Sequence, residues 1–183
     1  MIYWASDRES YNGLGYNKNA MRGIELPKSF DDLLTPALKN KMHIVSEESG
    51  ARMIGAMVRV KGEAIVRKLR DQNVTLHGTT AIGLNAMIVT GEAPISFTSV
   101  QTNILGSAEK GAPVAWFPLD LVPANAGGAG VYQYTQRPHA ALLFTDFLFS
   151  AEGQKMLAEK FGYGSAKRDY GFKRWYPEQG LST

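Results

Sequence analysis

The residue types that most often carry out catalysis are few in this sequence, and they stand far apart. Its 183 residues include no cysteine, which excludes thiol nucleophiles, disulfides and zinc knuckles. Ser49 precedes Gly50 without the Gly-x-Ser-x-Gly pattern of a serine hydrolase. No metal-ligand spacing relates the three histidines, His43, His77 and His139. We therefore expect no enzyme activity, no metal ion and no cofactor.

The acidic pair Glu47 and Glu48 has a spacing that suits no carboxylate chemistry. Adjacent side chains of an extended segment point to opposite faces, so the two carboxylates cannot flank one substrate bond or share one metal ion. We interpret both residues as surface charge. The Gly-rich residues 127–130 also lack the Gly-Lys-Ser/Thr ending of a phosphate-binding loop. The sequence therefore favours binding over reaction chemistry.

Hydrogen-bonding groups at the starts of helices are the features best suited to binding. A helix N-terminus offers backbone N–H groups without helical partners, and its partial positive charge favours an anion. Two such starts are expected, after residue 48 and after residue 78, and a third polar segment follows at 99–103. An ordinary N-cap explains each helix start equally well when it is taken alone. The candidate ligand-binding residues are Ser49, Gly50, Ala51, Thr79, Thr80, Ser99, Gln101 and Thr102.

Helices and strands alternate along the chain in a way that predicts an α/β fold. Short strands at 3–5 and 13–17 are expected on either side of a turn. Helices are expected after the turn at 47–51, over 63–72, from Thr79 or Thr80 to Gly91, after Pro138, and from Ser150 to about 161. Further strands are expected at 42–46, 93–98, 114–119 and 131–134, and the Gly-rich residues 123–130 are a candidate hinge.

Composition and charge exclude several classes of protein. Hydrophobic residues make up 44% of the chain and charged residues 20%, as in an ordinary globular protein. The 20 basic and 17 acidic residues leave a net charge of +3, and they are scattered. A nucleic-acid partner needs a clustered basic stripe, so we expect none. No apolar run approaches the length of a membrane span, and the first residues do not form a signal peptide.

Five motifs occur in an order that resembles a known family. They lie at 16–18, 27–39, 49–51, 91–95 and 138–154, and the last, PHAALLFTDFLFSAEGQ, is the most specific. Together they resemble the extracellular solute-binding proteins, family 1, of ABC importers. Within that group the ferric-iron and related anion-binding branch is the most similar.

The resemblance implies a periplasmic-binding-protein-like fold of class II, a mixed sheet flanked by helices in each of two lobes. Residues 1–122 would be the second, ligand-binding lobe with a crossover strand, and residues 123–183 the hinge and the returning C-terminal segment of the first lobe. The chain would then be a fragment without the N-terminal part of the first lobe and without its signal peptide. The protein would be periplasmic or extracellular, with the membrane permease of an ABC importer as its partner.

The resemblance also carries roles over to individual positions. The anion contact of the family falls on Ser49 and Gly50, with Ala51 following, and an Asn-bearing helix start falls near Thr79 and Thr80. The two tyrosines that bind iron in ferric members would fall on Gln101 and Thr102, and the asparagine before them on Ser99. Because a ferric ion prefers anionic oxygen ligands, the resemblance predicts that this chain does not capture bare iron.

The expected function is to bind a small anionic or polar solute in an interlobe cleft for import. The alternative is the effector-binding domain of a transcriptional regulator, which shares the fold and would carry a helix-turn-helix upstream. The helices expected after residue 137 are apolar and too few to close a core of their own. We expect that segment to pack on the second lobe or to pair with a second copy of the chain as a homodimer.

Overall fold

The computed structural model describes residues 4–165 and divides them into two compact units. One unit comprises residues 11–123. The other comprises residues 4–10 and 124–165. Strand β1 (Ala5–Asn17) contributes its first half to the second of these units and its second half to the first.

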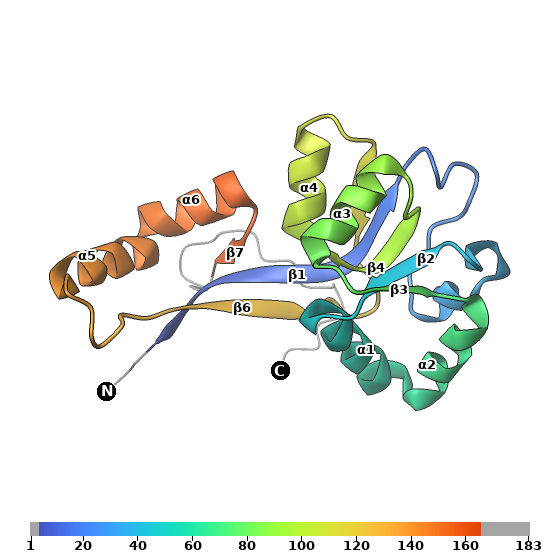
Figure 1. The fold of residues 1–183 in the computed structure, drawn as a ribbon, viewed down its shortest axis with the longest axis horizontal. Helices are drawn as coiled ribbons and strands as arrows, with labels where there is room; N and C mark the ends of the chain where they lie inside the picture. The colour runs from blue at the N-terminus through green and yellow to red at the C-terminus, as the bar shows by residue number, and fades with distance from the viewer. Residues whose placement is uncertain (1–3, 166–183) are drawn as a thin grey trace. The chain divides into compact units, whose positions relative to one another are not determined.

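The unit of residues 11–123 contains a mixed sheet with the strand order β3-β2-β4-β1-β5 (Figure 1). Strands β3 and β4 are both parallel to β2, whereas β1 is antiparallel to β4 and to β5. Three strands on one side of the sheet therefore end at the same edge. The bounds are β2 Met42–Val45, β3 Thr75–His77, β4 Ile95–Val100 and β5 Val114–Phe117.

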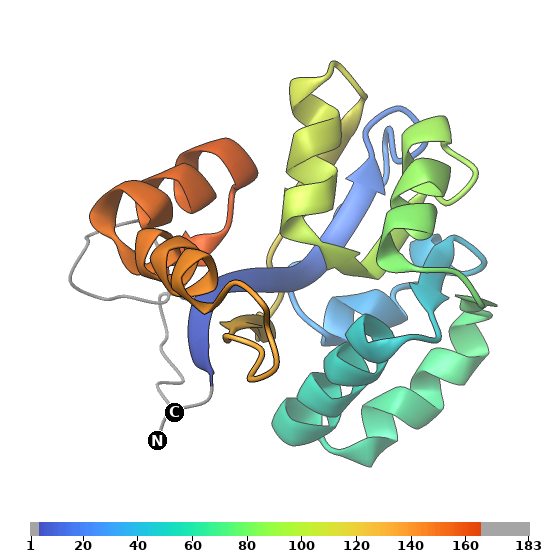
Figure 2. The same ribbon diagram turned by 60° about the vertical axis from the view of Figure 1, so that its left-hand side comes forward.

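Helices cover both faces of this sheet, as Figure 2 shows. Helices α1 (Glu48–Lys61) and α2 (Glu63–Leu69) pack in one apolar cluster, to which Met53 and Phe97 belong. Helices α3 (Ala81–Thr90) and α4 (Gln101–Glu109) pack in a second cluster around Ile88 and Ile104. Short 3-10 helices span Asp31–Leu34, Pro36–Leu38 and Arg70–Gln72. The expected α/β sheet flanked by helices is confirmed.

Strand β1 differs from the expected strand, turn and strand. It is one continuous strand whose pairing with β4 shifts between Gly13 and Gly15. Both glycines allow close packing. A Cβ atom at Gly13 would collide with the Trp116 ring, and one at Gly15 would collide with Ser99. The two glycines therefore do not break the strand as expected. They leave room for neighbouring side chains on the face of the sheet.

The unit of residues 4–10 and 124–165 contains β6 (Ala124–Ala129), β7 (Gly164–Ser165), α5 (Pro138–Phe149) and α6 (Ala151–Phe161). Both strands pair with β1. The Gly-rich candidate hinge includes β6, whereas the strand expected at 131–134 is irregular. The side-chain amide of Gln154, fully buried, donates to the Asp7 and Leu148 carbonyls at 2.8 Å and so ties α6 to β1 and to the end of α5.

Candidate functional site

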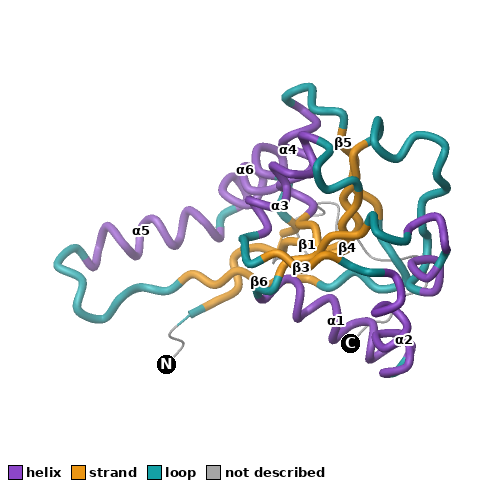
Figure 3. The backbone as a smooth tube through the Cα atoms, turned by 45° about the vertical axis from the view of Figure 1, so that its right-hand side comes forward, coloured by secondary structure: helices purple, strands orange, loops and turns teal. Residues whose placement is uncertain are grey.

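Three helices of the 11–123 unit begin where three parallel strands end. Helix α1 follows β2, α3 follows β3, and α4 follows β4 directly (Figure 3). Because β2, β3 and β4 are parallel neighbours, the three helix starts lie along one edge of the sheet. This carboxyl edge is where α/β sheets usually bind ligands, and the N-terminal turn of each helix presents N–H donors there.

The start of α1 depends on a close approach to β2. A Cβ atom at Gly50 would collide with the Val45 carbonyl oxygen, so only glycine lets the helix begin against the strand. Ser49 is buried, and its hydroxyl donates to the Glu47 carboxylate at 3.2 Å. Ala51 is exposed, and its N–H already donates to the Glu47 carbonyl at 3.1 Å. Of the three residues predicted here, Ala51 therefore contributes no N–H of its own.

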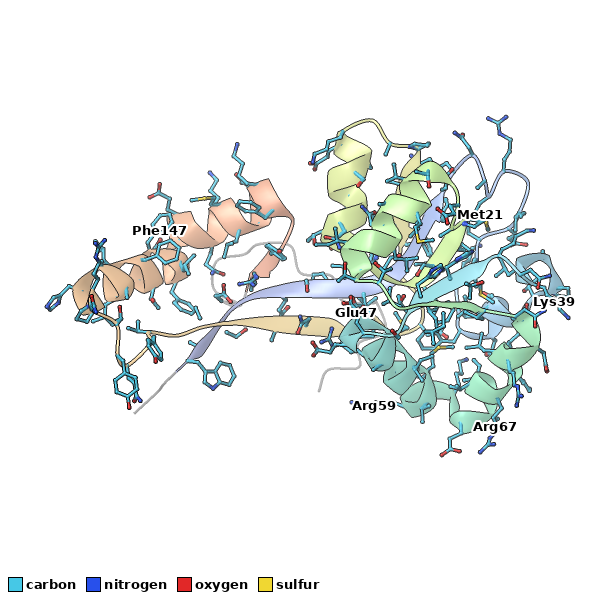
Figure 4. The ribbon with its side chains drawn as sticks, in the orientation of Figure 1. Met21, Lys39, Glu47, Arg59, Arg67 and Phe147 are labelled. Atoms are coloured by element: carbon cyan, nitrogen blue, oxygen red, sulfur yellow. The ribbon has the colours of Figure 1, made fainter. Side chains whose placement is uncertain are left out.

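Glu47 corrects the interpretation of the acidic pair as surface charge. Glu47, which is labelled in Figure 4, is the half-buried N-cap of α1. Its Oε1 accepts the Ala81 N–H at 2.7 Å as well as the Ser49 hydroxyl. One carboxylate thereby connects the starts of α1 and α3. Glu48, in contrast, is exposed and pairs with Arg52 one turn along α1. The pattern of adjacent acidic residues held no signal that only the first would face inward.

The start of α3 decides between the two alternatives, Thr79 and Thr80, for its cap. Thr80 is the N-cap, and its hydroxyl accepts the Gly83 N–H at 3.2 Å. Thr79 precedes it and packs beside Gly83, where a Cβ atom would collide with the Thr79 hydroxyl oxygen. Two of the first N–H groups of α3 are therefore satisfied within the protein, one by Thr80 and one by Glu47.

The start of α4 lies where the end of a polar strand was expected. Gln101 and Thr102 are the first residues of the helix, Gln101 buried and Thr102 half-buried. Ser99, in β4, is buried against Gly15, its hydroxyl donates to the Ser96 carbonyl at 3.4 Å, and its own carbonyl accepts the Trp116 indole N–H. The predicted residues at 99–102 thus divide into one that packs inside the sheet and two that begin a helix.

Asn12 is a candidate residue that sequence reasoning missed. It lies in β1 opposite Val100, the last residue of β4 and the N-cap of α4, and it is 1% exposed. Within the described part of the chain, its Nδ2 has no hydrogen-bond partner. Because side chains alternate along a strand, Asn12 shares the face of Leu14, which packs in the same cluster as Met53 of α1. A buried donor without an acceptor is rare and calls for a ligand or a water molecule.

A histidine pair lies beside the same edge. His43 Nδ1 and His77 Nε2 are 2.8 Å apart, and the two rings stack across the neighbouring strands β2 and β3. Burial and the adjacent His77 lower the pKa of His43, while Glu92 opposes that shift. The His77 carbonyl accepts the N–H of Ser46, the residue before Glu47. Among residues 4–165, no group of three or more acidic or histidine side chains could hold a metal ion.

The chain matches the model of one known protein family. The family model of bacterial extracellular solute-binding proteins matches residues 10–164. The chain belongs to this family of solute-binding proteins. The family membership supports the general function and the location outside the cytoplasm that the motifs implied. No helix within the described residues is both long enough and apolar enough to cross a membrane.

Three solved structures illustrate which proteins share this fold. The periplasmic binding protein P5PA is 24% identical with a TM-score of 0.72, and the match covers 94% of this chain and 57% of that one. A two-component system protein that mediates signal transduction is 19% identical, with a TM-score of 0.77 and coverages of 98% and 60%. Iron-bound HitA from Pseudomonas aeruginosa is 18% identical, with a TM-score of 0.67 and coverages of 91% and 57%.

These similarities confirm the periplasmic-binding-protein-like fold, and identities this low show the fold alone. The chain spans less than two thirds of the length of each of the three structures. A search among proteins of curated function found no match.

Proposed function

We propose that this chain is part of the solute-binding component of an ABC importer and that it binds a small polar or anionic solute at the carboxyl edge of β2, β3 and β4. The partners in this proposal are the solute and the membrane permease that receives it. Membership of the solute-binding family supports the general role. The binding residues proposed are those at the three helix starts, together with Asn12.

The observation that carries this proposal is the convergence of three helix starts on one edge of a parallel set of strands. Each start supplies backbone N–H donors, and the neighbouring side chains Thr80, Gln101 and Thr102 are neutral donors and acceptors. Such groups hold a solute by hydrogen bonds without reacting with it. The arrangement therefore suits capture and release.

The same residue types argue against iron as the direct ligand. Gln101 and Thr102 stand where ferric members of the wider group are expected to carry tyrosines, and neither offers an anionic oxygen. We expect no visible tyrosinate band when ferric citrate is added to the protein. A band that titrates at sub-micromolar iron would contradict this part of the proposal.

A ligand search with a matched pair of variants tests the proposal. Native mass spectrometry of the protein purified from its own host should detect a retained small molecule, and calorimetry with that molecule should give its affinity. Thr102→Val removes one hydroxyl at the start of α4 and should weaken binding about 10-fold, as expected for a lost hydrogen bond to a bound polar group.

The control is Thr90→Val, at the opposite end of α3, where the hydroxyl donates to the Met87 carbonyl. This variant should bind like the unmodified chain. Equal affinities for all three proteins would place the ligand elsewhere. Failure to find any ligand, together with normal uptake of solutes by a host that lacks the gene, would overturn the proposed function.

A further inference from the structure

The carboxylate of Glu47 lies between the starts of α1 and α3 and accepts a hydrogen bond from each. Its Oε1 lies 2.7 Å from the Ala81 nitrogen, and the carboxylate also accepts the Ser49 hydroxyl. Each helix N-terminus carries about half a positive charge, so one carboxylate offsets the two of them. The protein therefore brings its own negative charge to this part of the edge.

The other candidate groups along the edge add no positive charge. The side chains of Asn12, Thr80 and Gln101 are all neutral. Arg52, the basic residue on the first turns of α1, is already paired with the exposed Glu48. A second anion here would meet Glu47 without a cationic side chain among these groups to offset the repulsion.

Asn12 shows, independently of any helix start, that the edge lacks an acceptor. Its Nδ2 is buried and has no partner among residues 4–165, and the Asn12 backbone lies opposite Val100, the residue before α4. A ligand that fits both Asn12 and Glu47 must accept a hydrogen bond from the amide and donate one to the carboxylate. Hydroxyl groups do both, whereas a phosphate or sulfate mainly accepts and an ammonium group only donates.

We propose that Glu47 and Asn12 make this edge selective for a neutral, polyhydroxylated solute, a sugar or a polyol, over inorganic and organic anions. This inference rests on the proposed function, because it names the class of solute for the same site. In it, hydroxyl groups of the solute donate to the Glu47 carboxylate and accept from Asn12 Nδ2. Glu47 is then a specificity-determining residue.

Calorimetric titration of the 183-residue chain with two sets of probes tests the selectivity. The anionic probes are inorganic phosphate and sulfate, and the neutral probes are pentoses, hexoses and hexitols. We expect at least one neutral probe to bind 10-fold more tightly than either anion. Glu47→Gln keeps the acceptor oxygen that Ala81 and Ser49 use, so it should fold, and it should bind phosphate or sulfate at least 10-fold more tightly than the unmodified chain does.

Two further variants give the controls. Glu48→Gln removes the same charge one residue later, from an exposed side chain, and should change every affinity by less than 2-fold. Asn12→Asp keeps the shape but replaces the donor with an acceptor, and should weaken the neutral probe at least 10-fold. Far-ultraviolet circular dichroism would confirm that each variant is folded.

The outcomes separate this inference from the proposed function. If phosphate or sulfate binds the unmodified chain as tightly as every neutral probe, the selectivity is wrong while solute binding at the edge stands. If Glu47→Gln gains no affinity for anions over Glu48→Gln, Glu47 does not set the specificity. If no probe binds any of the proteins, both the inference and the proposed site are overturned.

Discussion

Helix α5 has a more apolar sequence than α1, and yet it is the less buried of the two helices. In the 11–123 unit, α1 buries five residues, Ser49, Gly50, Met53, Ala56 and Met57. In the other unit, α5 has no buried residue, although its sequence is PHAALLFTDFLF. Leu142, Leu143 and Phe144 are 56%, 72% and 62% exposed. Apolar composition therefore does not by itself predict that a helix is buried, because burial depends on which elements pack against it.

The two units nevertheless use the same local devices. Helices α1 and α6 each carry a glycine in the first turn, and a Cβ atom at Gly50 or Gly153 would collide with a preceding carbonyl oxygen. Each unit also holds a buried amide side chain that bonds to the backbone of another element. Asn17 donates to the Ile88 and Val89 carbonyls, and Gln154 donates to Asp7 and Leu148. The two units therefore use the same kinds of local contact and differ mainly in how far their helices are buried.

The largest effect is expected from the uncovered face of α5. Fully burying a large apolar side chain is worth about 1.5–3 kcal/mol, so three of them give a strong drive to associate. In a solution of the isolated chain, a second copy can supply apolar surface that covers them. We expect light scattering to show a dimer or larger species, and Leu143→Lys to shift it toward the monomer.

Ile82→Lys is the matched control for this prediction, because Ile82 is 70% exposed but lies on α3 of the other unit. It should leave the association unchanged. A chain that stays monomeric at high concentration would contradict this prediction. The exposed apolar residues of α5 would then not drive association.

The next effect concerns the first-turn glycines. Gly50→Ala should lower the free energy of unfolding by about 3 kcal/mol, because the new methyl group collides with backbone. Gly55→Ala, in the same helix with open space around it, should raise that free energy by up to about 1 kcal/mol. Gly153→Ala should cost less than Gly50→Ala, since the uncovered α5 is freer to shift. Urea denaturation measures all three, and equal losses at 50 and 153 would contradict the difference in coverage.

The buried amides should give a smaller effect. Asn17→Leu removes two donors and also the acceptor of the Asn19 and Ala20 N–H groups, so it should lower the free energy of unfolding by about 2–3 kcal/mol. Gln154→Leu leaves two carbonyls without their donor, which should cost about 1–2 kcal/mol. Native-state hydrogen exchange assigns each loss to its own unit. If either variant speeds up amide hydrogen exchange in both units, the two units do not unfold independently.

The smallest effect is a pH dependence confined to the 11–123 unit. The pKa of His43 is lowered in the folded protein, so the unfolded chain takes up a proton first as the pH falls. Stability should therefore be constant above about pH 6.5 and should decline as the pH falls from there through the folded pKa. His43→Phe should flatten that decline in thermal unfolding, whereas His139→Gln, on the exposed α5, should not. An unchanged profile for His43→Phe would exclude the histidine pair as its cause.

Local signals in the sequence predicted local structure well. Ser150 caps α6 where that helix was expected to begin, and Ser29 and Asp32, three residues apart, form reciprocal capping contacts. Gly91 ends α3 in the left-handed conformation, as expected. These features are set by hydrogen bonds within a few residues, which the order of residue types largely determines.

The features that the sequence did not predict depend on contacts between distant residues. Helix α4 was missed because its first residues are polar and continue directly from β4. The inward direction of Glu47 depends on Ala81, and the burial of Asn12 depends on Val100. Periodicity and spacing carry no information about such pairs, so the predicted site included the helix starts but not the carboxylate between them.

The position of β1 within the sheet has a consequence for biosynthesis. Residues 12–17 of this strand lie between β4 and β5, so that Leu14 pairs with Phe117, which is translated long after it. During translation, β1 is synthesised before the other strands of this sheet and remains unpaired until β4 and β5 follow, while β2 and β3 can already pair. Pairings between residues so distant in sequence form slowly, and an unpaired strand is prone to aggregate. Nascent chains of this protein should therefore depend on chaperones until residue 117 has emerged.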